Sequence, residues 1–111
     1  MDKVERYRQA VRKLLEQHKD FWSGDDQIEN QLFFDDERDH YQLMSVGWNE
    51  LERVYHTVLH FDIKDDKVWL QQNTTDIDVG QELIDLGVDK KDIVLGLHPP
   101  YKRPYTGYGV A

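Results

Sequence analysis

The sequence has no cysteine, only three prolines, all within its last fourteen residues, and no apolar run long enough to cross a membrane. Without cysteine there is no disulfide framework, thiolate metal site or cysteine nucleophile. The charged start, MDKVERYRQAVRKLL, lacks the apolar core of a signal peptide. At 111 residues the chain fits one compact domain, residues 1–111, and we expect it to be cytoplasmic.

Basic side chains are also scarce and unevenly placed. The chain has 14 Lys and Arg against 22 Asp and Glu, a formal charge of −8. Residues 21–98 hold six basic and eighteen acidic side chains, whereas the two ends, residues 1–20 and 99–111, are each basic by two charges. Because nucleic-acid binding draws most of its affinity from cations that neutralise phosphates, the acidic middle disfavours DNA binding over a broad surface.

Hydrophobic periodicity predicts an α+β fold. Apolar residues at three- and four-residue spacing indicate an amphipathic helix over residues 2–19, after which the period changes to two. Four strands then follow one another through short turns, which implies an antiparallel four-stranded meander. The predicted strands are 28–35, 40–48, 52–64 and a fourth that begins at Val68.

A second helix is predicted over residues 77–86, capped by Asp76 or Asp78 and ended by Gly87. Asp89 is placed to cap a short turn over residues 90–92, before a short strand at residues 93–97. We expect the N-terminal and C-terminal helices to pack on one face of the sheet. The strand at residues 52–64 is expected to be central, because apolar residues lie on both of its faces.

The last fourteen residues, HPPYKRPYTGYGVA, form what we call the C-terminal arm, residues 98–111. Its prolines predict an extended or polyproline-like conformation. Tyrosine and arginine are favoured in interface hot spots, so the arm is a candidate partner-binding surface. Equally, its tyrosines could pack back on the sheet with bonded hydroxyls. The candidate partner-binding residues are Tyr101, Lys102, Arg103, Tyr105 and Tyr108, and a possible ligand pocket would use His98, Tyr101 and Tyr105.

No motif predicts a metal, cofactor or catalytic site. His56 and His60 on one strand lie roughly 13 Å apart, too far to share a metal ion. His60 and Asp62 are closer, at about 7 Å between Cα atoms, but two ligands do not make a site. The acidic run 35–40 is expected to be a hairpin turn with an internal Arg38 ion pair, and no nucleophile or phosphate loop is recognisable. We therefore expect no cofactor and no enzyme activity.

Nearly the whole chain resembles the XisI-like family, named for a controlling factor in excision of the fdxN element. The stretches that carry the resemblance are ERDHYQLMSVGW, RVYHTVLHFDIKDDKVWLQQN, TDIDVGQEL, DIVLGLHPPYKRPYTGYGVA and the amphipathic start VERYRQAVRKLL. The resemblance implies an accessory role: with a second accessory protein, XisH, the founding member is required for a recombinase to excise a DNA element. The family offers no catalytic residue set to carry over.

The resemblance and the charge together favour an accessory interaction protein that binds an XisH-like partner and self-associates, with a dimer favoured. One alternative is a directionality factor that binds DNA directly. It would use cations of the first helix together with Lys102 and Arg103, and needs both ends on one face. The helical cations are Lys3, Arg6, Arg8, Arg12 and Lys13. Another alternative is a small enzyme or ligand-binding protein centred on His98.

Overall fold

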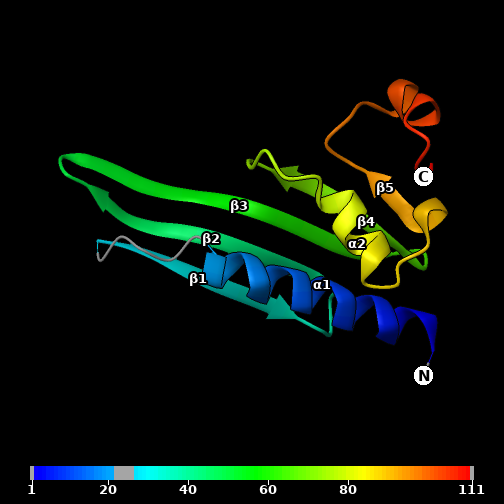
Figure 1. Ribbon diagram of the computed structural model, residues 1–111, viewed down its shortest axis with the longest axis horizontal. Helices are drawn as coiled ribbons and strands as arrows, with labels where there is room; N and C mark the ends of the chain where they lie inside the picture. Colours follow the sequence, from blue (N-terminus) through cyan, green and yellow to red (C-terminus); the bar gives the residue numbers. More distant parts are fainter. Residues whose placement is uncertain (1, 22–26, 111) are drawn as a thin grey trace.

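The computed structural model describes residues 2–21 and 27–110. A long helix precedes a five-stranded sheet whose strands follow chain order, β1-β2-β3-β4-β5, so β3 is the middle strand, as predicted (Figure 1). The elements are α1 (Lys3–Phe21), β1 (Ile28–Asp35), β2 (His40–Asn49), β3 (Glu52–Lys64), β4 (Lys67–Asn73), α2 (Val79–Asp85) and β5 (Ile93–Leu95). The α+β class and the first four antiparallel strands are confirmed.

The sheet is mixed, which corrects the prediction of a purely antiparallel four-stranded meander. β5 pairs with β4 in parallel, with Val68 opposite Ile93 and Leu70 opposite Leu95. A parallel neighbour requires a crossover, and α2 supplies it by carrying the chain back to the end at which β4 begins. The short strand predicted at 93–97 is therefore the edge strand β5, which ends at Leu95.

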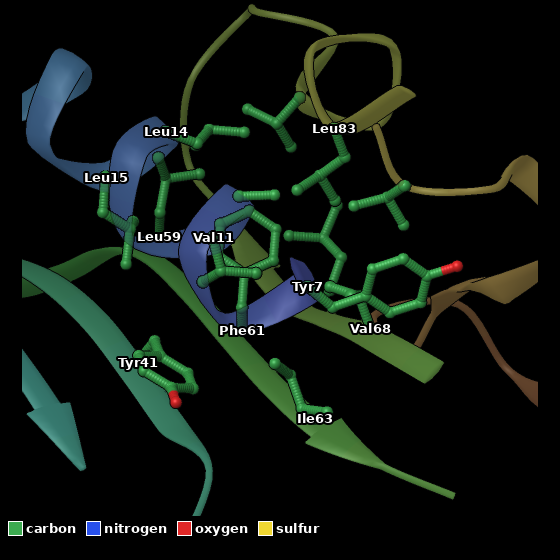
Figure 2. Packing of buried hydrophobic residues seen from close by; sticks show 14 of the residues in the cluster. Tyr7, Val11, Leu14, Leu15, Tyr41, Leu59, Phe61, Ile63, Val68 and Leu83 are labelled. Atoms are coloured by element: carbon green, nitrogen blue, oxygen red, sulfur yellow. The ribbon is translucent and has the colours of Figure 1, made fainter. Parts of the chain in front are cut away.

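Both helices cover one face of the sheet, as expected. Tyr7, Val11, Leu14 and Leu15 of α1 lie over the inner face, and Leu83 of α2 closes the same cluster (Figure 2). Beneath them lie buried side chains of three strands: Tyr41, Leu59, Phe61, Ile63 and Val68. The three- and four-residue spacing of α1 explains this packing, because it places its large apolar side chains on one stripe.

Local signals fix the ends of these elements. Asp65 and Asp66 both have positive φ, 55° and 61°, as a two-residue turn of type I′ requires between β3 and β4. Asp78, not Asp76, caps α2, with its Oδ1 accepting from the Gln81 amide at 3.1 Å. Gly87, at φ 103°, ends the helix in the left-handed region, and Val88 N donates back to Leu83 O, which completes a Schellman cap.

The C-terminal arm is not extended, which corrects the second part of the fold prediction. Pro99 keeps polyproline-like angles, φ −60° and ψ 151°, but Pro100–Tyr105 form a 3₁₀ helix, η2. The Lys102 amide donates to Pro99 O at 3.0 Å, and the Thr106 amide to Arg103 O at 3.2 Å. Proline's fixed φ suits the first turn of a helix, where its missing donor is not needed, so Pro100 starts a turn instead of preventing one.

Among the described residues, no helix is long and apolar enough to cross a membrane.

Candidate functional site

The C-terminal arm is fixed at both ends to the edge of the sheet. At its start, the Leu97 amide donates to Leu70 O of β4 at 3.1 Å. Near its end, the Gly109 amide donates to Ile93 O of β5 at 2.8 Å, beside an isolated parallel bridge to Val94. A Cβ at Gly109 would lie 2.1 Å from the Lys91 carbonyl oxygen, so only glycine allows this approach. The arm is thus a closed loop on the domain.

Arg103 anchors the middle of this loop to the outer face of the sheet. Its guanidinium lies 5.2 Å from the ring centroid of Trp69, which Lys64 approaches at 4.0 Å. Arg103 Nε also donates to the His98 carbonyl at 3.2 Å, closing the turn between them. Trp69 is only 8% exposed although it faces away from the helices, because the two cations and the arm cover it.

Tyr108 is a second anchor. Its ring lies against α2, where a Cβ at Gly80 would come within 2.7 Å of the Tyr108 hydroxyl. Lys90 Nζ stands 5.2 Å from the ring centroid. Burial, and then the neighbouring Asp78 carboxylate, raise the pKa of Tyr108 above its usual value. Tyr108 therefore packs inward on its own domain.

Tyr101, Lys102 and Tyr105 point outward, and we call these three residues the arm surface. Tyr101 is 71% exposed and Tyr105 is 88% exposed, although they stand on a helix whose backbone is held in place. Lys102 is also exposed, and Leu97 and Val110 add exposed apolar groups near both ends of the arm. The five predicted partner-binding residues thus divide into two anchors and three outward side chains.

His98 does not join Tyr101 and Tyr105 in a pocket. It lines a recess of about 190 Å³ between the β4–β5 edge and the start of α2, together with Asp78, Leu97 and Tyr108. Neither Tyr101 nor Tyr105 lines this recess. The three residues of the predicted ligand pocket therefore do not converge there.

The basic residues of α1 are largely occupied by carboxylates. Arg8 Nε lies 2.7 Å from Asp39 Oδ1. Arg12 Nη1 lies 2.9 Å from Asp36 Oδ2, and Lys3 Nζ lies 2.8 Å from Asp92 Oδ2. Arg6 and Lys13 are the exposed helical cations that line a recess beside α2. A phosphate backbone would have to compete with fixed ion pairs at three of the five positions.

The histidines of β3 lie on opposite faces, so His56 and His60 do not share a site. His56 lines a recess of about 400 Å³ on the helix side, beside Ser45. His60 faces the other side, with its Nε2 2.8 Å from Asp62 Oδ1. His40 of β2, which strand periodicity alone does not place near this pair, lies directly opposite Asp62 with its Nδ1 2.7 Å from the same oxygen.

Comparison with known proteins agrees with this fold over the whole domain. The model of the family described as XisI protein matches residues 1–110. This chain belongs to the XisI family. A crystal structure of a XisI-like protein from Anabaena variabilis superposes with a TM-score of 0.93 at 53% identity, covering 97% of this chain and 99% of that one.

A second XisI structure from Anabaena variabilis is described as the fdxN element excision controlling factor. It is 30% identical and superposes with a TM-score of 0.87, covering 99% of this chain and 100% of that one. No curated protein matches the chain. The XisI fold therefore extends over this entire domain, including the C-terminal arm that had no regular folding signal.

Proposed function

We propose that this XisI-family chain is a non-catalytic accessory factor that regulates site-specific excision of a DNA element by binding an XisH-like protein through its arm surface. The observation that carries this proposal is the exposure of Tyr101 and Tyr105 on a backbone held by hydrogen bonds at both ends. Large aromatic side chains on a pre-organised backbone lose little conformational entropy on binding. Tyrosine is also one of the residues enriched in interface hot spots.

The charge distribution supports a protein partner over DNA. The arm carries Lys102 and Arg103 and no acidic residue, on a chain of net charge −8. One of these two cations, Arg103, is held over Trp69, and three cations of α1 pair with carboxylates. The arm surface is therefore small and aromatic, with Lys102 as its one cation. Such a surface complements a partner with an apolar patch and an acidic rim.

Binding of an XisH-like protein by arm-surface variants tests the proposal. Tyr101→Ala combined with Tyr105→Ala should weaken the complex by at least about tenfold in Kd, measured by calorimetry, because the pair contributes the largest exposed aromatic area of the arm. The matched control is Tyr55→Ala, which removes a tyrosine that is also exposed, 65%, but lies on β3 far from the arm. Equal affinity of the wild type and the double variant would contradict the proposal.

A salt titration separates this function from direct DNA recognition. We expect the isolated chain to bind the element DNA weakly, with a shallow dependence of log K on log salt. Neutralising several phosphates would produce a slope steeper than roughly −3, since each contact contributes about −0.9. Tight binding with that slope would replace the partner proposal with a DNA-binding factor. Self-association stays a separate prediction, which sedimentation of the chain alone would check.

A further inference from the structure

The outer face of the sheet brings together three metal-ligating side chains from two strands. His60 and Asp62 lie two residues apart on β3 and face the same side, and His40 of β2 is the cross-strand partner of Asp62. His40 Nδ1 lies 2.7 Å and His60 Nε2 lies 2.8 Å from one and the same oxygen, Asp62 Oδ1. The ligand atoms of the three residues all lie within 4.8 Å of one another.

This geometry is close to that of a metal site. Zinc takes imidazole nitrogens at about 2.0–2.1 Å and carboxylate oxygens at about 2.0–2.2 Å, so tetrahedral ligand atoms stand roughly 3.4 Å apart. The two nitrogens would have to move away from Asp62 Oδ1 by about 0.6–0.7 Å to admit the ion. The side chain of His40 is 53% exposed and has room to do so, whereas His60 and Asp62 are more enclosed.

A supporting residue already orients the carboxylate. Gln71 of β4 donates from Nε2 to Asp62 Oδ2 at 3.1 Å, which leaves Oδ1 for the two imidazoles. Gly96 makes room for this glutamine, because a Cβ there would stand 2.5 Å from Gln71 Oε1. Carboxylates that bind metals are typically held by such an outer hydrogen bond. The cluster thus has its three potential ligands and a positioning residue from three adjacent strands.

We propose that His40, His60 and Asp62 form a binding site for a divalent transition metal ion of the Zn²⁺, Ni²⁺ or Cu²⁺ type. Two imidazoles and one carboxylate suit these ions, whereas Mg²⁺ and Ca²⁺ prefer oxygen ligands throughout. Because the His40 side chain is half exposed, the remaining coordination positions of the ion are open to water or to a ligand atom from outside the chain. Because only three protein ligands are present and His40 is half exposed, we expect moderate affinity. This site does not depend on the proposed partner function.

The test is Cu²⁺ and Zn²⁺ binding to the full, untagged chain. Pulsed electron paramagnetic resonance of the Cu²⁺ form should show two coupled imidazoles in the wild type and one in His40→Asn or His60→Asn. Calorimetry with Zn²⁺ should give one ion per chain, with Kd weakened at least about tenfold in either variant, since loss of an outer-shell partner alone costs that much. His56→Asn, on the opposite face of β3, is the matched control and should bind as the wild type does.

Circular dichroism should be used to check that each variant is folded. Asp62→Asn provides a third variant that keeps the size of the side chain. Two results would overturn the site. One is the absence of saturable Zn²⁺ binding by the wild type up to about a millimolar, the range of weak binding. The other is wild-type affinity in the His40, His60 and Asp62 variants, which would mean that the ion binds elsewhere and that the cluster is an ordinary carboxylate–imidazole network.

Discussion

Residues of the same type have opposite placements in the C-terminal arm. Tyr108 packs against Gly80 and Lys90, while Tyr105, three residues earlier, is almost wholly exposed. Arg103 covers Trp69, while its neighbour Lys102 faces out. The sequence identifies all of these residues as candidates, but it does not show which of them pack on the domain and which face out. That depends on the turn of η2 and on which ring lies beneath it. At this scale, anchoring and partner binding belong to different side chains.

The division predicts unequal effects on stability. Arg103→Ala removes a cation from above the Trp69 ring and a hydrogen bond to His98 O, so it should lower the free energy of unfolding by about 1–2 kcal/mol. Tyr105→Ala should change it by less than about 0.5 kcal/mol. Urea unfolding followed by tryptophan fluorescence measures both. Equal losses in the two variants would show that Tyr105 also packs on the domain.

Asp92 predicts a dependence of stability on pH. Burial opposes its ionisation, but hydrogen bonds from Lys3 Nζ at 2.8 Å and the Tyr7 hydroxyl at 2.6 Å outweigh burial and lower its pKa. A lowered pKa stabilises the fold above the unfolded value, near 3.9, and this contribution is lost as the pH falls through the folded value.

Asp92→Asn should therefore cost about 1–2 kcal/mol at pH 7, and the difference from the wild type should shrink below about pH 4. Acid titration of urea unfolding at several pH values measures this difference. Asp65→Asn, in the exposed β3–β4 turn, serves as the control. Asp89→Asn is less suitable as a control because Asp89 caps the turn next to Asp92. A constant difference between Asp92→Asn and the wild type across the titration would contradict the assignment.

Elements with a strong local signal could be predicted from the sequence, and those that depend on pairing could not. The β3 strand, the turn at Asp65–Asp66 and the Gly87 helix end follow from period and turn chemistry. The His40 neighbour of Asp62 does not. A two-residue turn at Glu50–Leu51 alone would place His40 opposite Phe61, and the β-bulge between Leu43 and Met44 shifts the register by one residue.

The same reasoning accounts for β5 and η2. Their positions depend on the α2 crossover and on hydrogen bonds from the Leu97 and Gly109 amides to the sheet, which are contacts between segments far apart in sequence. Proline content predicted an extended arm because it restricts φ, but that restriction permits 3₁₀ turns as well as polyproline helix. Tertiary anchoring decided between the two conformations.

The start of α2 offers a test at the scale of the element. Asp78→Ala removes the side-chain cap on Gln81 N and should lower the free energy of unfolding by about 1 kcal/mol. It also removes a charge that raises the pKa of Tyr108, so the phenol should titrate closer to its ordinary value. Asp76→Ala is the control, since the sequence allows either residue to be the cap. Denaturant unfolding measures the change in stability, and ultraviolet titration of tyrosine measures the change in the pKa of Tyr108. A larger loss of stability in Asp76→Ala than in Asp78→Ala would show that Asp76 is the cap.

The whole molecule is elongated, with principal extents of 42 × 33 × 24 Å. The β2–β3 hairpin projects past the helices at one end, and the N-terminus and the arm lie at the other (Figure 1). The hairpin tip carries exposed Trp48, Leu51 and Tyr55. Within residues 2–21 and 27–110, the hairpin tip and the arm surface are thus separate exposed aromatic regions, and we propose that the partner binds the arm surface.

Amide hydrogen exchange of the chain, alone and with an XisH-like protein, tests that assignment most directly because it maps protection along the entire backbone. We predict that the partner slows exchange most strongly over residues 101–106 of the arm and leaves exchange at the hairpin tip, residues 48–55, unchanged. Protection confined to the hairpin tip, with the arm exchanging at the rate of the free chain, would contradict it.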